Sequence, residues 1–384
     1  MNKSFDVIII GAGSIGLPAA YYCALKKLKV LVIDAEHGPG QQNNKKAIGG
    51  VRATHSDFGK IHTCLRSIEI LSSFEQLYGY DIGWMSNGYS FPAYEEQDEK
   101  KLKDLMVVQH QFGLNIKWVS AEEYQILVPG ITKEGLRGAT YSPEDGSCSP
   151  LLVAAAYYFM CLEQEVTFQW NEQVTGFRHN DQTITGVVTD KGEYSAGEVI
   201  NCPGNNAQEI GQKLGLDLPV FPDNHEAGIT EPVKRFFGPM VVDMRKRPGS
   251  ANFYFYQNHE GQVVFCITPD PPLLGVDNRS TSEFLPLCSK RMLEVYPRLR
   301  HLKVRRTWRG QYPMTPDGFP IVGRSREYSN LINAVGMCGQ GFMLGPGLGE
   351  LLARILIGQR DEQDHKVLSS FDPYRSFIGM EEFK

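Results

Sequence analysis

The sequence lacks the features that mark metal proteins, nucleic-acid binders and low-complexity chains. Its eight cysteines include no C-x-x-C pair, which argues against a zinc site or a cysteine-ligated cluster. The formal net charge of -5 provides no basic footprint for nucleic acid, and the RKR cluster at residues 245–247 is interpreted as a solvated loop. No low-complexity tract or short repeat is present. We therefore expect a globular cytoplasmic protein with reduced thiols and no metal.

Apolar runs suited to a membrane are also missing. Residues 7–25 and 331–349 carry no charge, and hydropathy alone would make both stretches candidates for a membrane span. Each contains several glycines and a proline, however, and Asp6 rather than a basic residue precedes the first. These stretches are typical of cofactor loops, so no membrane span is predicted. At 384 residues the chain is long enough for two domains.

The first uncharged stretch carries a dinucleotide-binding fingerprint. A nearly continuous apolar run at residues 5–10 predicts a parallel strand buried on both faces. The turn at residues 11–16 reads G-x-G-x-x-G and leads into a predicted helix at residues 17–27. A second predicted strand at residues 30–33 ends in Asp34. Strand, turn, helix, strand and terminal acid therefore follow one another in the order that the fingerprint requires.

Each part of the fingerprint has a physical role. The glycines permit a tight turn, close approach of a pyrophosphate and close packing of the helix, whose N-terminus attracts the phosphates. The acid is placed to accept hydrogen bonds from the adenosine ribose. This fingerprint alone does not separate NAD from FAD. The ligand-binding residues predicted here are Gly11, Gly13, Ser14, Ile15, Gly16, Asp34 and Ala35.

The rest of the pattern predicts two domains that are interleaved in the sequence. Strand-like segments between residues 166 and 204 continue the dinucleotide domain, whereas period-two alternation at residues 218–270 predicts antiparallel strands with a hairpin turn at residues 258–261. An amphipathic helix is expected at residues 59–78, and Ser120 opens a capping box. We expect an α/β chain with a Rossmann-like domain (residues 1–83, 140–217 and 325–384) and a mostly antiparallel substrate domain (residues 84–139 and 218–324).

Three further segments point to one family. Residues 49–52 read GGVR, residues 308–318 read WRGQYPMTPDG, and residues 336–343 read GMCGQGFM before a helix expected at residues 348–357. With the fingerprint, they resemble the D-amino-acid oxidase (DAO) superfamily of FAD-dependent oxidoreductases. The similarity is greatest to glycine oxidase, sarcosine oxidase and the beta subunits of bacterial sarcosine oxidase and proline dehydrogenase, and it spans nearly the whole chain.

The resemblance implies that the Rossmann-like domain binds FAD. Arg52 would approach the flavin ring, and backbone amides at the start of the last helix would stabilise negative charge on the reduced flavin. Val174 would meet the adenine side, and the loop at residues 202–204 would support the cofactor again. The further cofactor contacts expected from the resemblance are Gly49, Gly50, Val51, Arg52, Val174, Cys202, Pro203, Gly204, Gly310, Gly339, Gln340, Gly341, Phe342 and Met343.

The resemblance also implies a reaction. In this family an amine with a hydrogen on the adjacent carbon passes a hydride to the flavin, and water hydrolyses the resulting imine. The chain is therefore expected to oxidise the C–N bond of a small amine or amino acid of the sarcosine, glycine, proline, D-amino-acid or opine type. The protein would mainly align the substrate and favour the neutral amine. The residues expected to line this site are Arg52, His55, Tyr254, Tyr256 and Tyr312.

The chain departs from the family pattern at several positions. Tyr312 stands where glycine oxidase has an arginine for the substrate carboxylate, and Gln340 replaces the usual histidine. Some relatives attach a flavin covalently, either through a cysteine at the position of Gly310 or through a histidine near residues 149–150. This chain has neither side chain there, so non-covalent FAD is expected. The predicted strand at residues 262–268 has no lysine like the one that activates oxygen in monomeric sarcosine oxidases. This favours a dehydrogenase that passes electrons to a partner.

The sequence alone leaves two other functions open. The same superfamily includes flavoproteins that oxidise 2-hydroxy acids, for which a histidine base such as His55 or His225 would be valuable. Alternatively, the chain is an electron-transfer subunit of a larger complex, which the missing arginine would favour. The substrate, its stereochemistry, the electron acceptor and the oligomeric state are not determined by the sequence.

Overall fold

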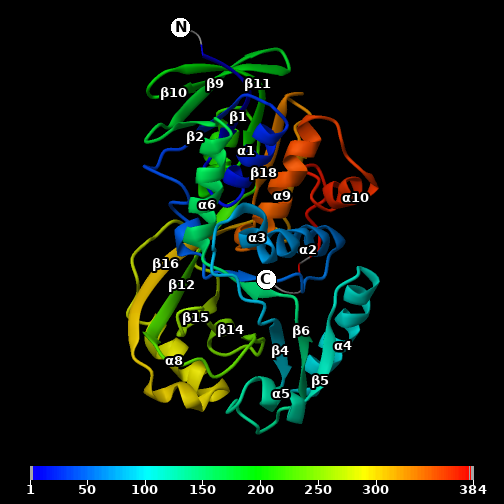
Figure 1. Ribbon diagram of the computed structural model, residues 1–384, viewed down its shortest axis with the longest axis vertical. Coiled ribbons are helices and arrows are strands. Elements are labelled where there is room, and N and C mark those ends of the chain that lie inside the picture. Colours follow the sequence, from blue (N-terminus) through cyan, green and yellow to red (C-terminus); the bar gives the residue numbers. More distant parts are fainter. Residues whose placement is uncertain (1–2, 380, 382–384) are drawn as a thin grey trace.

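The computed structural model describes residues 3–379 and 381, which form two parts stacked along the long axis of the molecule (Figure 1). Each part contains an eight-stranded sheet. The first sheet is built around parallel strands and the second is mainly antiparallel, which confirms the α/β class with two kinds of sheet predicted from the sequence. Segments that are distant in the sequence meet in each part.

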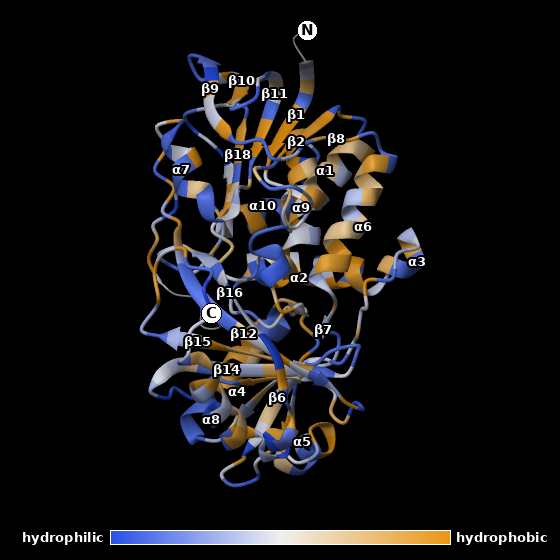
Figure 2. Cartoon of the chain, turned by 90° about the vertical axis from the view of Figure 1, so that its left-hand side faces the viewer, coloured by the Kyte–Doolittle hydropathy of each residue, from blue (hydrophilic) through white to orange (hydrophobic). Residues whose placement is uncertain are grey.

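The first sheet has buried parallel strands at its centre. In β1, Val7 and Ile9 belong to the core on one face, whereas Ile8 and Ile10 belong to the core on the other. Because both faces are covered, the central strands are apolar along most of their length (Figure 2). The spatial order is β17 (Ile321–Arg324), β18 (Leu331–Val335), β11 (Glu193–Asn201), β1 (Lys3–Ile10), β2 (Val30–Ile33) and β8 (Thr167–Gln169), with β10 (Thr183–Thr189) joining β9 (Val174–Asn180) to β11.

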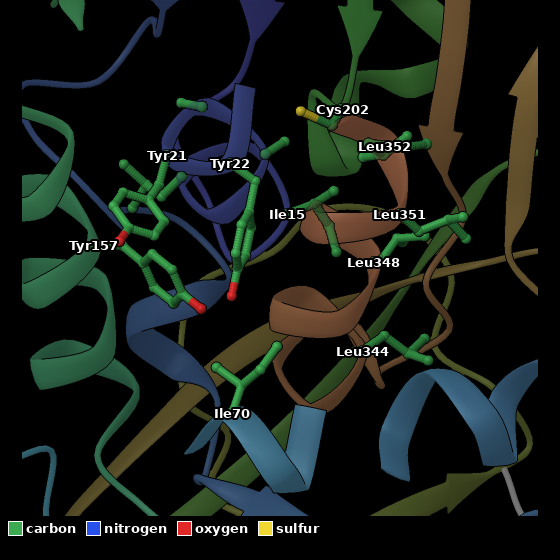
Figure 3. Close-up of a cluster of buried hydrophobic side chains, with 14 of the residues drawn as sticks. Ile15, Tyr21, Tyr22, Ile70, Tyr157, Cys202, Leu344, Leu348, Leu351 and Leu352 are labelled. Atoms are coloured by element: carbon green, nitrogen blue, oxygen red, sulfur yellow. The ribbon is translucent and has the colours of Figure 1, made fainter. Parts of the chain in front are cut away.

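Glycines let two helices approach each other closely on one face of this sheet. A Cβ atom at Gly345 would lie 2.1 Å from the carbonyl oxygen of Ser14, and one at Gly349 would lie 2.5 Å from Pro18 Cβ. Figure 3 shows the side chains around this contact, including Tyr22. The helices of this part are α1 (Gly16–Leu25), α2 (Phe58–Ser72), α3 (Phe74–Tyr78), α6 (Pro150–Glu163), α9 (Gly341–Leu356) and α10 (Glu362–Ser370), with α7 (Ala207–Gln212) on the opposite face.

The second sheet forms the other part. Its aromatic core, which includes Phe253 and Phe255, packs under α5 (Ala121–Leu127) and α8 (Phe284–Val295). The predicted hairpin turn and the capping box at Ser120 are both confirmed. The spatial order is β16 (Val304–Met314), β12 (Phe221–Pro232), β15 (Gln262–Asp270), β14 (Gly249–Gln257), β13 (Met240–Asp243), β4 (Tyr89–Ala93), β6 (Gly138–Ser142) and β5 (Lys117–Ser120), and α4 (Glu96–Gln111) packs on β4 and β6.

The predicted helix at residues 17–27 is α1 at Gly16–Leu25, and two other predicted helices differ more in their bounds. The helix expected at residues 59–78 is divided at Ser73 into α2 and α3. The last glycine-rich helix begins at Gly341 rather than near residue 348, because Pro346 is accommodated inside the helix. Within the described residues, none of the helices is long and apolar enough to cross a membrane.

The interpretation of residues 245–247 as a solvated loop is wrong for two of the three side chains. Arg245 donates to Asp243 at 2.8 Å and its guanidinium lies 3.9 Å from the ring centroid of Tyr94. Arg247 donates to Glu294 at 2.7 Å. Only the side chain of the lysine between them extends into solvent. Nearby carboxylates therefore hold this basic cluster in the structure of the second part.

Candidate active site

One large cavity, of about 870 Å³, is lined by residues from both sheets. This volume suits a cofactor together with a small molecule. Most of the residues predicted from the sequence lie in its wall. They are Gly11, Gly13, Ser14, Ile15, Asp34, Ala35, Gly49, Gly50, Arg52, Val174, Cys202, Pro203, Gly204, Tyr254, Gly310, Tyr312, Gly339, Gln340, Gly341, Phe342 and Met343.

The glycine turn after β1 leaves space where a pyrophosphate must approach. Gly11 has a φ of +106°, and a Cβ there would lie 2.5 Å from the carbonyl oxygen of Cys202. A Cβ at Gly16 would lie 1.8 Å from the carbonyl oxygen of Gly11, so Gly16 serves the turn itself and does not line the cavity. A Cβ at Gly13, in contrast, meets no atom within 4 Å. The turn thus fits a phosphate at the start of α1.

The acid after β2 is held by backbone amides. Asp34 Oδ2 accepts a hydrogen bond from the amide of Ala12 at 2.6 Å, and Oδ1 accepts one from the amide of Glu36 at 2.8 Å. Each carboxylate oxygen keeps a second lone pair for a ribose hydroxyl. Glu36 also lines this end of the cavity and was not predicted. Adenosine at this end and phosphates at the turn would leave the remainder of the cavity, called here the ring-binding end, for the flavin ring.

The loop before β3 (Gly50–Val51) is fixed by tyrosines from the second sheet. A Cβ at Gly50 would lie 1.9 Å from the hydroxyl of Tyr89. The Tyr256 hydroxyl donates to the carbonyl oxygen of Ile48 and does not line the cavity. The expectation that Tyr256 faces the substrate is therefore not supported. Val51 is fully buried and also lies outside the cavity wall, where β3 pairs with β7 (Gly146–Ser147).

The first turn of α9 faces the cavity at the ring-binding end. Residues 341–343 lie in the wall, and the first amides of a helix have no partner within the helix. A Cβ at Gly339 would lie 2.4 Å from the ring of Tyr312. This close approach places the helix N-terminus beside the tyrosine on β16. Partial positive charge at this terminus suits a ligand that gains negative charge.

Four polar and aromatic side chains form a group in the wall provided by the second sheet. The hydroxyls of Tyr254 and Tyr312 are 2.7 Å apart, and the Tyr312 ring stacks on His225 with centroids 3.7 Å apart. His225 Nε2 lies 3.1 Å from Asp223 Oδ2. All four residues line the cavity. Burial raises the pKa of both tyrosines, so their hydroxyls stay protonated.

Arg52 lies in the cavity wall, but His55 does not. Arg52 Nη1 donates to the carbonyl oxygen of Thr54 and lies 3.3 Å from His55 Nδ1. The other ring nitrogen of His55 is 3.6 Å from Cys64 Sγ, and the histidine has no exposed surface. Burial, with the charges of Arg52 and Lys60, holds the pKa of His55 well below its usual value. The expectation that His55 faces the substrate is not supported, since it is a neutral side chain behind Arg52.

Several cavity residues could not be recognised from the sequence. Asn43, Lys46 and Glu381 line the wall but belong to no motif. Trp308, at the start of the WRG motif, donates from Nε1 to the carbonyl oxygen of Lys46 at 2.7 Å. This hydrogen bond fixes the loop that carries Lys46. Among residues 3–379 and 381, no group of three or more His, Cys, Asp and Glu side chains could hold a metal ion.

Comparisons with known proteins agree with this geometry. The profile of the family described as FAD dependent oxidoreductase (DAO) matches residues 6–355. The sarcosine oxidase subunit beta of Rhodobacter capsulatus is 23% identical over 100% of this chain and 89% of its own length. The crystal structure of L-proline dehydrogenase from P. horikoshii superposes with a TM-score of 0.90 and 28% identity, covering 98% of both chains. Glycine oxidase from Geobacillus kaustophilus has the same fold, with a TM-score of 0.87 and 22% identity over 98% of this chain and 100% of its own.

The family match covers most of the sequence, and the cavity is lined by the glycine turn after β1, by the acid after β2 and by the N-terminus of α9. These features fit FAD. The chain belongs to the DAO family of FAD-dependent oxidoreductases.

Proposed function

We propose that this protein oxidises the C–N bond of a small amine or amino acid. The observation that carries this proposal is the group formed by Tyr254, Tyr312, His225 and Asp223, which lies in the same cavity as the phosphate turn and the α9 N-terminus. Bound FAD would accept a hydride from the carbon next to nitrogen. Relatives named sarcosine oxidase, glycine oxidase and L-proline dehydrogenase support an amine substrate.

The chain's own residues would bind and orient that amine. Tyr89, Phe91 and Met240 give the cavity an apolar wall, which disfavours an ammonium ion and so favours the neutral amine from which hydride is removed. The paired hydroxyls of Tyr254 and Tyr312 would orient the polar part of the substrate. Their hydrogen bonds are weaker than those of a bidentate arginine, which predicts weak discrimination between substrates with and without a carboxylate.

Arg52 would stabilise negative charge on the reduced cofactor rather than transfer a proton. Its guanidinium lies in the wall of the same cavity as the first turn of α9. Both would favour the negative charge that the pyrimidine edge of the cofactor gains on reduction. No protein base is needed if the amine is bound neutral.

Anaerobic bleaching of the bound flavin tests the proposal. The holoenzyme is mixed without oxygen with glycine, sarcosine, L-proline, D-amino acids, opines and 2-hydroxy acids, and the flavin absorbance is followed. Bleaching by an amine, with none by hydroxy acids, is the expected result. Bleaching by hydroxy acids alone would overturn it. Substrate-free holoenzyme and heat-denatured protein serve as controls.

The His225–Asp223 contact favours one second candidate, oxidation of a 2-hydroxy acid. An alcohol must lose a proton as its hydride leaves, and a histidine oriented by a carboxylate is a suitable base. Under this alternative, His225→Asn should lower the rate of flavin reduction by about 10²- to 10⁴-fold. Under the main proposal the same variant should bind the amine less well but reduce the flavin at a similar limiting rate.

We also propose that electrons leave to a partner protein. Two relatives are named as subunits, the sarcosine oxidase subunit beta and the hydrogen cyanide synthase subunit HcnC of Pseudomonas protegens, the latter 23% identical over 93% of this chain and of its own length. The β15 strand in the cavity wall carries no lysine. The reduced flavin should therefore reoxidise slowly in air and rapidly with an artificial acceptor such as a phenazine. Rapid reoxidation in air would make the protein an oxidase.

A further inference from the structure

A buried ion pair connects the C-terminal segment to the ring-binding end of the cavity. Glu381 lines the cavity, and its Oε2 lies 3.2 Å from Nζ of Lys60, with neither side chain exposed. Ser56 Oγ donates to Glu381 Oε1 at 2.7 Å. In the described part of the chain, Glu381 supplies the only carboxylate in salt-bridge contact with Lys60. Glu381 therefore compensates the charge of a lysine that water does not reach.

Other contacts of Lys60 fix its ammonium group in place. Nζ donates to the carbonyl oxygen of Gly318 at 2.7 Å and lies 4.7 Å from the ring centroid of Phe319. Both belong to the T-P-D-G-F turn that follows β16, and Thr315 of this turn lines the cavity. A rigidly held charge in a poorly solvated site acts over longer distances than a charge in water.

The C-terminal segment is fastened to the same turn. Arg375 makes two hydrogen bonds to Asp317, at 2.8 and 3.0 Å, and a third to the carbonyl oxygen of Phe319 at 2.9 Å. The amide of Glu381 donates to the carbonyl oxygen of Asp317 at 3.1 Å. These contacts hold the carboxylate of Glu381 opposite Lys60.

The charge of Lys60 reaches the cavity wall. It acts on two buried side chains, one in the wall and one behind it: it opposes the rise that burial causes in the pKa of Cys338, and it contributes to the lowered pKa of His55, behind Arg52. Cys338 lies in the cavity wall three residues before α9. The cationic charge at the ring-binding end is therefore that of Arg52 and Lys60 together, reduced by Glu381.

We propose that Lys60 and Glu381 are positioning residues that set the reduction potential of the bound flavin. Lys60 favours the negative charge gained on reduction, and Glu381 limits that effect. Removing one partner leaves the other charge uncompensated in a buried site. The proposal rests on FAD binding alone and does not depend on which substrate is oxidised.

The test measures the midpoint potential of the flavin in holoenzyme variants, with a reference dye and without substrate. Glu381→Gln should raise the potential, because the neutral amide no longer offsets the charge of Lys60. Lys60→Met should lower it, and the double variant should return close to the wild-type value. Each single variant should change the ratio of FAD affinities in the two redox states at least tenfold, which is about 30 mV for a two-electron couple.

A matched control removes a lysine of another ion pair. Lys366→Met breaks the exposed contact with Glu362, at 2.7 Å, and should leave the potential unchanged because solvent screens that charge. If Glu381→Gln does not fold, Lys60→Arg and Lys60→Met make the same comparison, since only the first keeps the charge. A purely structural role would lower stability in every variant without opposite shifts. Shifts in the same direction, or a double variant that is not restored, would overturn the proposal.

Discussion

Gly13 allows cofactor binding to be separated from folding. A Cβ at this position meets no protein atom within 4 Å, whereas one at Gly16 would lie 1.8 Å from a backbone oxygen. Gly13→Ala should therefore leave the apoprotein as stable as wild type, or more stable by about 0.4–1 kcal/mol because the unfolded chain loses entropy. The added methyl group would nevertheless occupy the space through which a pyrophosphate approaches the turn. Gly16→Ala should instead destabilise the apoprotein by about 1–3 kcal/mol or more, since the turn must open.

The two variants are compared by the same assays. FAD is removed and titrated back while its fluorescence is followed, and urea unfolding of the apoprotein gives the free energy of unfolding. For Gly13→Ala the dissociation constant should rise at least tenfold, about 1.4 kcal/mol, with an unchanged urea midpoint. Wild-type FAD affinity in this variant would show that the phosphates do not pass over Gly13. Early unfolding of its apoprotein would contradict the open space seen at this glycine.

Three further changes test other parts of the site. Tyr312→Phe removes the hydroxyl that pairs with Tyr254 at 2.7 Å but keeps the ring. The value of kcat/KM for the preferred amine should therefore fall about tenfold, with little change in stability. An unchanged kcat/KM would exclude Tyr312 from substrate positioning. Burial raises the pKa of the Asp145 carboxyl to about 7, above the ordinary value of 3.8. Ionisation of this group should therefore lower the free energy of unfolding by up to about 4 kcal/mol as the pH rises from about 4 to 7. Asp145→Asn should remove that decline, measured by urea unfolding at about pH 5 and pH 8, and parallel wild-type and variant curves would refute it. Gly345→Ala places a methyl group 2.1 Å from the Ser14 carbonyl oxygen, so both stability and FAD affinity should fall. A variant that loses only one of them would contradict the contact between α9 and the phosphate turn.

Most of the residues expected to bind the cofactor could be placed in one cavity wall because their sequence signals are local. The turn at residues 11–16 lies between a strand and a helix whose apolar patterns are visible in the sequence, and its glycines are required by contacts within the same unit or with one neighbouring loop. Hairpin and capping-box signals likewise depend on a few consecutive residues. Glu36 was missed because the fingerprint places one acid after the second strand, whereas Asp34 and Glu36, which both follow that strand, line the cavity.

The errors arise where local spacing does not determine direction. His55 follows Arg52 by three residues, but this segment is irregular, so its spacing does not determine which side chains share a face. The histidine ring turns towards α2, where Cys64 lies, and away from the cavity. The contact between Ser56 and Glu381 joins residues that are 325 positions apart, and nothing in either segment indicates the other.

The part of the cavity proposed to bind substrate is determined by the register of the second sheet. Asp223 of β12 pairs with Tyr312 of β16, and His225, two residues along β12, lies on the same face as Asp223. Tyr254 and Tyr256 also share a face, yet successive residues on one face are about 7 Å apart, so the first reaches the cavity while the second meets the loop at Ile48. Side chains from β12, β14 and β16 therefore form the wall proposed to bind substrate, whereas glycines contribute much of the wall proposed to bind the cofactor. Because the two walls are built from different atoms, substitutions at Asp223, His225 or Tyr254 should alter substrate choice while FAD affinity is retained.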